Sequence, residues 1–138
     1  MLSTLTASSK YFEDFTPGDV YRHARGKTVT EMDNVMITNM VMNTAEGHFN
    51  EHLMKGNEIF GQRVVFGGIN ISMVIGLAAQ DTAGNALAEL GMDHIRWRHP
   101  VVHGDTLYAY SEVLSAVDAE REDAGVVTFR HWGVNQDD

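Results

Sequence analysis

Residues 43–52, NTAEGHFNEH, form the densest run of chemically useful side chains in the sequence. They include two histidines, two carboxylates and two asparagines. Because histidine titrates near neutral pH, His48 could act as a general acid or base while a polar neighbour orients a water molecule. A solvated loop whose histidines have no function has the same composition, and the residue types alone favour that simpler interpretation.

A metal site is a third interpretation of the same segment. His48 and His52 are four residues apart, which would place both on one side of a helix, as zinc ligands can be. The chain has no cysteine, and no third ligand stands at a recognisable spacing. We therefore expect no metal.

The second candidate feature is the pair Gly67 and Gly68, which precedes the apolar run of residues 69–79. Free N–H groups at a helix N-terminus suit an oxyanion, and glycine lets a ligand approach the backbone closely. A glycine pair can also simply turn the chain before a helix, and the pair alone does not separate the two roles.

The third candidate feature is the segment of residues 96–107, RWRHPVVHGDTL. Arg96 and Arg98 are expected on one face of a strand, where they could reach phosphates, although solvated edge arginines are commoner. Pro100 and Gly104 predict a loop before the next strand, and for Asp105 we expect a purely structural role.

The elements that must position these residues follow from periodicity. Thr30 with Asp33 resembles a capping box at the start of a helix that ends near residues 43–44. Residues 45–61 are expected to form a loop with one short helix, and residues 69–79 a helix that is apolar all round and therefore buried. Strands are predicted at residues 20–28, 86–98, 106–116 and 126–134. Methionines and valines repeat at helical spacing along the first helix: Met32, Val35, Met36, Met40 and Val41. The methionines are expected to fill the core.

Composition limits the function classes. The 138 residues carry a formal charge of −9, which argues against nucleic acid and against a polybasic membrane contact. The longest apolar stretch is too short to span a bilayer, and no signal peptide is recognisable. Since no cysteine is present, a reducing compartment is favoured, and we expect a cytoplasmic protein.

The predicted architecture is one α+β domain over residues 11–138, after a flexible N-terminus of residues 1–10. A helix that is apolar all round needs cover on most sides, and an antiparallel sheet curved around it would provide that cover, as in the hot-dog fold. Residues 135–138 have a turn-like composition, as if a hairpin were about to return. We therefore expect a sheet that lacks one last strand.

Four sequence blocks go beyond composition: YFEDFTPGD, NTAEGHFNEH, FGQRVVFGG and PVVHGDTLYAYSEV. Their order and separation resemble the MaoC-like dehydratases, which are hot-dog (R)-specific enoyl-CoA hydratases. The resemblance runs from Tyr11 to about Gln136 and is nearest to the mesaconyl-CoA hydratase (β-methylmalyl-CoA dehydratase) branch. It implies water addition to, or removal from, a 2-enoyl-CoA thioester.

The resemblance also implies roles for single residues. The family motif has an aspartate, a histidine five positions later and an acidic residue two positions after that. Carried onto this chain, the histidine is His48, the aspartate position is Asn43 and the acidic position is Asn50. Either Asn43 positions water for His48, or Glu46 supplies the carboxylate, or the domain is weakened or inactive. The resemblance places the thioester carbonyl at Gly68.

Partners and alternatives follow from the same resemblance. The expected partner is an acyl-CoA, with coenzyme A as part of the substrate and no other cofactor. The chain is also expected to form a homodimer or a larger homo-oligomer. A non-catalytic MaoC-like subunit and a hot-dog thioesterase remain open, as does the identity of the acyl group. The candidates for binding coenzyme A phosphates are Arg63, Arg96 and Arg98, with Arg22 and Arg25 as further possibilities.

Overall fold

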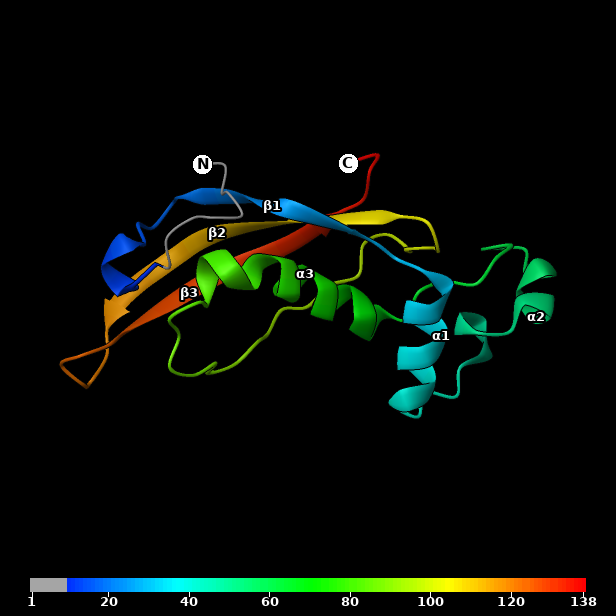
Figure 1. Ribbon diagram of the computed structural model, residues 1–138, viewed down its shortest axis with the longest axis horizontal. Coiled ribbons are helices and arrows are strands. Elements are labelled where there is room, and N and C mark those ends of the chain that lie inside the picture. The colour runs from blue at the N-terminus through cyan, green and yellow to red at the C-terminus, as the bar shows by residue number, and fades with distance from the viewer. Residues whose placement is uncertain (1–9) are drawn as a thin grey trace.

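A three-stranded antiparallel sheet with one long helix packed against it forms the body of the molecule (Figure 1). The computed structural model describes residues 10–138, so the flexible N-terminus expected for residues 1–10 lies, apart from Lys10, outside the described residues. The strand order is β1 (Val20–Thr28), β2 (Thr106–Asp118) and β3 (Gly125–Val134). The sequence therefore predicted these three strands correctly.

A tight turn leads the chain into β1. Asp19 N–H donates to the Thr16 carbonyl at 3.0 Å, and Gly18 has a φ of 94°, a conformation that costs glycine little. Tyr21 then pairs with Ser111 of β2, and Tyr108 pairs with Val134 of β3. The central strand β2 is thus held on both sides.

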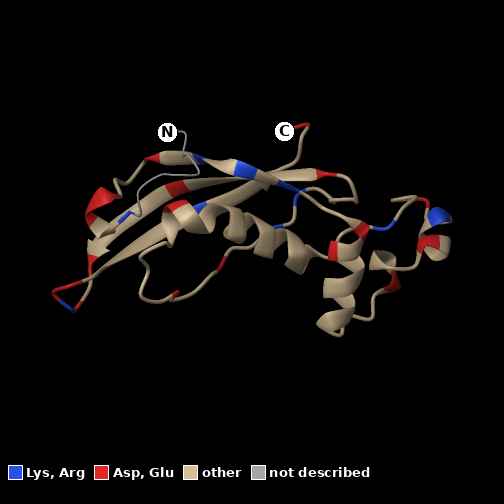
Figure 2. Ribbon diagram, in the orientation of Figure 1, with Lys and Arg blue, Asp and Glu red and all other residues tan. Residues whose placement is uncertain are grey.

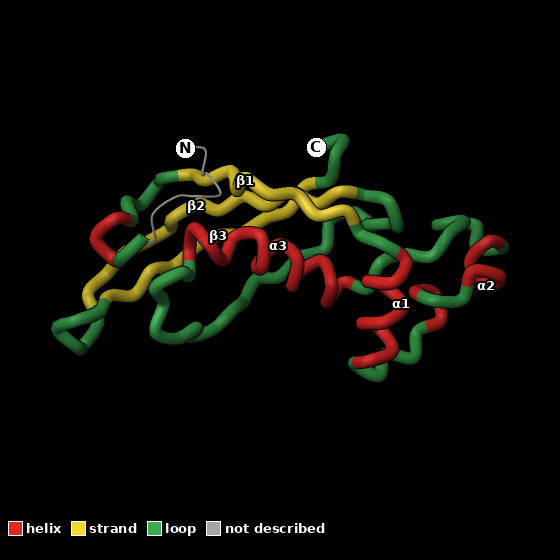
Figure 3. Tube along the Cα trace, viewed as in Figure 1, coloured by secondary structure: helices red, strands yellow, loops and turns green. Residues whose placement is uncertain are grey.

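Helix α3 (Gly67–Thr82) follows the sheet along most of its length (Figure 3). The expectation of a helix over residues 69–79 is confirmed, but the expectation that it is buried all round is wrong. Ile69 and Ala78 are buried, whereas every fourth residue on the opposite side is exposed: Ser72, Gly76 and Gln80. The three described strands cover one side of this helix, which explains the difference.

The strand expected at residues 86–98 is absent from the described chain. The segment belongs to no helix or strand, and it leaves Leu90 78% and Trp97 60% exposed. Its apolar residues have the composition of a strand, yet no described strand lies beside it to pair with its N–H and C=O groups. The expected sheet of four or more strands is therefore three-stranded here.

Helix α1 (Glu31–Met40) and two short elements form one end of the molecule. The capping box is confirmed, because Asp33 N–H donates to Thr30 Oγ1 and Thr30 N–H donates to Asp33 Oδ2. The helix ends before residues 43–44. The loop that follows carries a 3₁₀ turn, η2 (Glu46–His48), and the helix α2 (Glu51–Lys55), rather than one short helix. Elsewhere, a further 3₁₀ turn, η1 (Phe12–Asp14), precedes β1.

The orientation of α1 differs from the expectation. Met32 and Met40 are 71% and 70% exposed, whereas Asn34 and Thr38 are fully buried. The prediction that the methionines fill the core is therefore wrong for this helix. Its two fully buried side chains are polar because Asn34 hydrogen-bonds to the neighbouring loops and Thr38 donates to Asn34. Of its apolar side chains, partly buried Ile37 packs against an apolar cluster of the core.

The interior has two apolar clusters with a buried polar group between them. One cluster joins Val29, Val65, Ile69 and Leu107 near the start of α3. The other, at the far end of the sheet, joins Phe15, Tyr21 and Val113. Between them, His23 Nδ1 lies 2.7 Å from Asp81 Oδ2, and His23 Nε2 lies 2.7 Å from Ser111 Oγ.

Charged residues of both signs are distributed over the described elements (Figure 2). Lys and Arg occur on the strands and on α2, with acidic residues nearby. Within residues 10–138, no helix has the length and apolar character needed to cross a membrane.

Candidate functional site

The buried side of α1 holds the loop that contains the candidate catalytic residues. Asn43 N–H donates to the Thr38 carbonyl at 3.0 Å, and the Asn34 side-chain amide donates to the His48 carbonyl at 2.8 Å. Asn34 and Thr38 are one helical turn apart and therefore face the same way. The Thr38 carbonyl at the C-terminal turn of α1 and the Asn34 side chain thus fix the two ends of the segment from Asn43 to His48.

The ring of His48 has a defined protonation pattern. His48 Nδ1 lies 2.8 Å from the Val64 carbonyl oxygen, which can only accept a hydrogen bond. The neutral ring therefore carries its proton on Nδ1 and leaves the lone pair on Nε2. The ring is half-buried and packs against Phe66 with 5.6 Å between the ring centres. A neutral histidine held in this way can act as a general base through Nε2.

The N-terminus of α3 begins directly beside that ring. Phe66 is the N-cap residue, and no side chain caps the helix. Ile69 N–H donates to the Phe66 carbonyl at 2.9 Å, whereas the N–H groups of Gly67 and Gly68 remain available as donors. Two glycines occupy that first turn for steric reasons. A Cβ at Gly68 would lie 2.7 Å from the Phe66 ring, and a Cβ at Gly67 would overlap the Trp97 indole.

A cavity of about 430 Å³ opens at this end of α3. Gly67 and Asn70 line it from the helix, and Trp97 and Arg98 line it from the exposed segment that follows α3. His48 and Gly68 do not line it. They are next to the cavity because Val64, which accepts the His48 hydrogen bond, and Phe66, which packs on the His48 ring, do line it.

The other polar residues of the loop mainly bond to one another. Asn43 Oδ1 accepts from Ala45 N–H at 2.9 Å, and exposed Glu46 accepts from the Asn50 side-chain amide at 3.0 Å. Asn50 also caps α2 by accepting from Leu53 N–H. Within the described chain, neither the Asn43 nor the Glu46 side chain hydrogen-bonds to His48.

The three candidate arginines have different surroundings. The guanidinium of Arg63 lies between the carboxylates of Glu31 at 2.8 Å and Glu51 at 2.5 Å, and it joins α1 to α2. Exposed Arg96 donates to the carbonyl of its neighbour Ile95. Arg98 borders the cavity. The expectation that Arg96 and Arg98 share a strand face is wrong, because their segment forms no strand.

The helical geometry considered for a metal site does not form. His48 ends the 3₁₀ turn and His52 lies in α2, so the two residues belong to different elements. No group of three or more His, Asp or Glu side chains in the described part of the chain is arranged to hold a metal ion.

Asp105 has the structural role that the sequence suggested. Its Oδ2 accepts from Val102 N–H at 3.0 Å, and its Oδ1 accepts from the Gln136 side chain at 2.9 Å. The carboxylate thereby closes the loop before β2 and ties it to the C-terminal turn.

Sequence reasoning missed Asn34 and His103. The Asn34 amide nitrogen lies 3.0 Å from His103 Nε2, and Asn34 Oδ1 accepts from Phe66 N–H at 3.1 Å. Burial lowers the pKa of His103, and the positive charge of Arg63 lowers it further, while Glu31 and Glu51 oppose the shift. The available signal was the pair Asn34 and Thr38, polar and one turn apart on a helix that carries methionines elsewhere.

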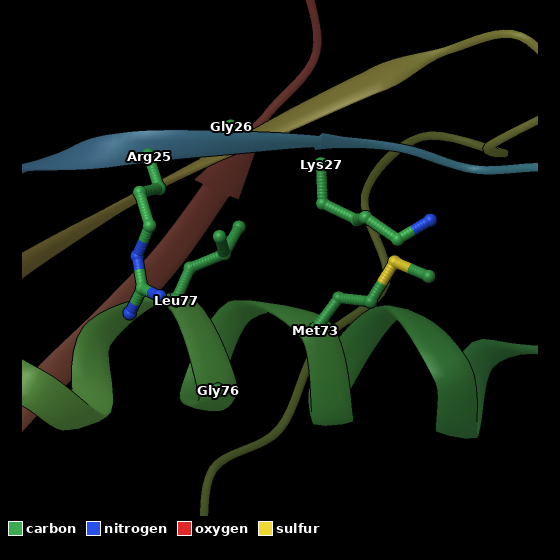
Figure 4. A pocket seen from close by; sticks show the side chains of 6 residues that line it. All are labelled: Arg25, Gly26, Lys27, Met73, Gly76 and Leu77. Carbon is green, nitrogen blue, oxygen red and sulfur yellow. The ribbon is translucent and has the colours of Figure 1, made fainter.

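A second, shallower groove of about 320 Å³ separates β1 from α3. Figure 4 shows Arg25 and Lys27 extending from β1 toward Leu77 and Met73 of the helix. Lys27 Nζ is also 2.8 Å from Asp33 Oδ2, so this cation has a partner on α1. None of the candidate catalytic residues lines this groove.

Comparisons with known proteins identify related sequences over nearly the whole chain. The mesaconyl-CoA hydratase family profile matches residues 4–138. A β-methylmalyl-CoA dehydratase of Chloroflexus aurantiacus is 35% identical over 126 residues, which cover 90% of this chain and 35% of the relative. The chain thus spans about a third of the length of this curated relative.

Solved structures agree with this relationship. A MaoC domain protein from Chloroflexus aurantiacus superposes with a TM-score of 0.83 and 31% identity, over 94% of this chain and 36% of the other. A Mycobacterium tuberculosis protein described as having a double hot-dog fold superposes with a TM-score of 0.69 and 23% identity, over 94% and 36%. The first match supports membership of this family, and the second shows the fold. Together with the helix packed on an antiparallel sheet, these matches show that the chain has a hot-dog fold and belongs to the mesaconyl-CoA hydratase family.

Proposed function

We propose that the protein catalyses the addition or removal of water at the double bond of a 2-enoyl-CoA thioester. The observation that carries the proposal is the hydrogen bond from His48 Nδ1 to the Val64 carbonyl, beside the uncapped N-terminus of α3. This arrangement brings a neutral base next to backbone donors that suit an oxyanion. Family membership supplies the substrate class.

In the hydration direction, His48 Nε2 removes a proton from water while the water oxygen bonds to C3 of the acyl group. The electron pair of the double bond moves toward the thioester carbonyl, and an enolate forms. The N–H groups of Gly67 and Gly68 would stabilise its oxygen. The proton held on Nε2 then passes to C2, which completes the addition of water and restores the neutral ring. The step transfers only water and protons and is balanced without an oxidant or a reductant.

Asn43 is the proposed water-positioning residue. An amide can donate and accept hydrogen bonds but does not exchange protons as a carboxylate does. Its Oδ1 is engaged by Ala45 N–H, which leaves the NH₂ group to orient the water. Glu46 is the alternative carboxylate, although in the structure it accepts from Asn50.

For the substrate, we propose mesaconyl-CoA or a similar branched dicarboxylic acyl-CoA, as the names of the family and of the dehydratase relative suggest. Arg98 is the best placed of the three candidate arginines to meet a coenzyme A phosphate, because it borders the cavity. Arg63 and Arg96 remain predictions for the same role.

We also propose that residues 11–138 form one hot-dog unit that pairs with a second such unit, for instance another copy of this chain. The support is the exposure of Leu87, Leu90 and Trp97 together with the chain's span of about a third of its curated relative. A cytoplasmic location fits a CoA thioester substrate and a chain without cysteine.

The test is a hydration assay on crotonyl-, mesaconyl- and itaconyl-CoA, followed through the absorbance of the enoyl thioester. His48→Ala should lower turnover by roughly 10²- to 10⁴-fold, because it removes the acid–base group. His52→Ala is the matched control, since this exposed histidine lies in α2 and outside the proposed site. Equal turnover by His48→Ala and the unaltered protein would refute the assignment.

Asn43 supports a second candidate, a non-catalytic subunit of a larger hydratase, because it stands where the family motif has an aspartate. That candidate predicts no turnover by the chain alone and co-purification with a second hot-dog chain. Release of free thiol from the same substrates would instead identify a thioesterase.

A further inference from the structure

Asn34 is a fully buried amide with more hydrogen-bond partners than it has N–H groups. Its Nδ2 lies 2.8 Å from the His48 carbonyl, 3.0 Å from the Val64 carbonyl and 3.0 Å from His103 Nε2. Its Oδ1 accepts from Phe66 N–H at 3.1 Å. Burying an amide is unfavourable unless it is bonded, so this set of contacts holds the surrounding backbone in one arrangement.

The partners of Asn34 surround the imidazole of His48. The Val64 carbonyl that Asn34 contacts is also the acceptor for His48 Nδ1, at 2.8 Å. Phe66, whose N–H Asn34 binds, packs on the His48 ring and is the N-cap residue of α3. The same amide therefore bonds to the His48 backbone, to the acceptor of its ring proton and to the start of the helix beside it.

We propose that Asn34 is a positioning residue that keeps His48 in the tautomer with its proton on Nδ1 and directs Nε2 toward the reaction site. This rests on the hydratase function proposed above. Without Asn34, one backbone–backbone hydrogen bond among the described residues, from Val64 N–H to the Gly47 carbonyl at 3.1 Å, would still join the segments of His48 and Val64. The Val64 carbonyl could then turn away, and Nδ1 would lose its fixed acceptor.

His103 further restricts the orientation of the Asn34 side-chain amide. Its Nε2 can accept from the Asn34 amide only while it is unprotonated. Burial and the nearby Arg63 favour that neutral form, against the opposing carboxylates of Glu31 and Glu51. The two N–H bonds of Asn34 thus serve three acceptors, and the amide cannot rotate to exchange its oxygen and nitrogen without facing two carbonyls with its own oxygen.

The test combines Asn34→Ala with ¹⁵N NMR of the imidazole nitrogens, in which protonated and bare nitrogens are distinguished. His48→Gln identifies the His48 signals by their disappearance. The unaltered protein should show a protonated Nδ1, and Asn34→Ala should show a mixture of both tautomers. In the hydration assay, kcat should fall by about 10²-fold with little change in KM, because misplacement of a catalytic group has an effect of that size.

Two further variants keep the test decisive. Ser111→Ala removes a buried hydroxyl from a different network and controls for a general loss of stability. It should leave the His48 tautomer and kcat unchanged. Asn34→Ser keeps a smaller polar group that can donate one hydrogen bond and accept another, and serves if Asn34→Ala does not fold.

The outcomes separate the positioning role from the proposed activity. A folded Asn34 variant that keeps a pure Nδ1-protonated His48 and normal kcat would overturn the positioning role. If the unaltered protein hydrates none of the substrates, the proposed function fails, but the NMR comparison still decides whether Asn34 sets the tautomer.

Discussion

At the level of single residues, the amide of Asn43 limits the acid–base chemistry of the proposed site. It can align a water molecule but cannot take up its proton. Asn43→Asp should therefore raise the hydration rate by roughly tenfold or more, because a second group able to exchange protons joins His48. Hydration rates of the variant and of the unaltered protein at the same neutral pH check this effect.

Asn57→Asp is the matched control for this change. Asn57 Oδ1 accepts from Ile59 N–H and Phe60 N–H, and an aspartate can accept the same two bonds. It adds the same negative charge without adding an acid to the loop that holds His48. An equal gain in both variants would show that charge alone, rather than the position of residue 43, changes the rate.

Among the secondary-structure elements, α1 depends on its first turn. The Asp33 carboxylate accepts from Thr30 N–H and from Lys27 Nζ, both at 2.8 Å. Thr30→Ala removes the hydroxyl that accepts from Asp33 N–H and should lower the free energy of unfolding by about 1 kcal/mol. Urea titration measures the loss. Thr28→Ala, which removes an exposed hydroxyl bonded to Thr106, should lose less.

The contribution of Asp33 also has a defined pH range. The hydrogen bond from Lys27 and those from Thr30, against an opposing effect of burial, lower the pKa of this carboxyl from 3.8 to about 2. A carboxyl with a lowered folded pKa stabilises the fold above its unfolded pKa and loses that effect as the pH falls. The stabilisation by the Asp33 carboxylate should accordingly be full above pH 3.8 and shrink as the pH falls toward about 2, which urea titrations of Asp33→Asn and of the unaltered protein across this pH range would measure.

The same helix shows what the sequence could and could not reveal. Local signals were sufficient for the capping box of Thr30 and Asp33 and for the three observed strands, because these depend on neighbouring residues. Methionines at helical spacing could not indicate the buried side of α1, since the chain buries Asn34 there against distant backbone groups. The apolar composition of residues 86–98 likewise predicted a strand without revealing that no described strand lies beside it.

For the candidate site, the sequence identified the loop but not its geometry. His48 and the two glycines in the first turn of α3 were recognisable from residue type and from the family blocks. The hydrogen bond between His48 and Val64 joins residues 16 positions apart, and no local pattern encodes it. The binding of Asn34 to three separate segments is a tertiary feature of the same kind.

For the molecule as a whole, stability should depend on pH through His131. Its Nδ1 lies 2.6 Å from Ser111 Oγ, which also contacts His23, itself bonded to Asp81. Burial lowers the pKa of His131 below 6.5, and the charge of His23 lowers it further. The unfolded chain therefore binds this proton more readily than the folded one. The free energy of unfolding should fall as the pH drops below 6.5, which urea titrations between pH 7.5 and 5.5 would measure.

His131→Asn should flatten this pH dependence, because asparagine does not titrate. His94→Asn is the control, since the His94 side chain is 86% exposed and its φ of 53° suits asparagine. If the free energy of unfolding of His131→Asn depends on pH as strongly as that of the unaltered protein, other groups cause the effect.

The polar group between the two apolar clusters has a consequence for how the molecule opens. Along β2, the inward residues pass from Leu107 in one cluster, through Ala109 and Ser111, to Val113 in the other. Separately packed regions often behave as separate cooperative units. The end that contains α1 and the His48 loop can therefore open while the β2–β3 hairpin end stays closed. Amide hydrogen exchange would then show two levels of protection within one continuous strand.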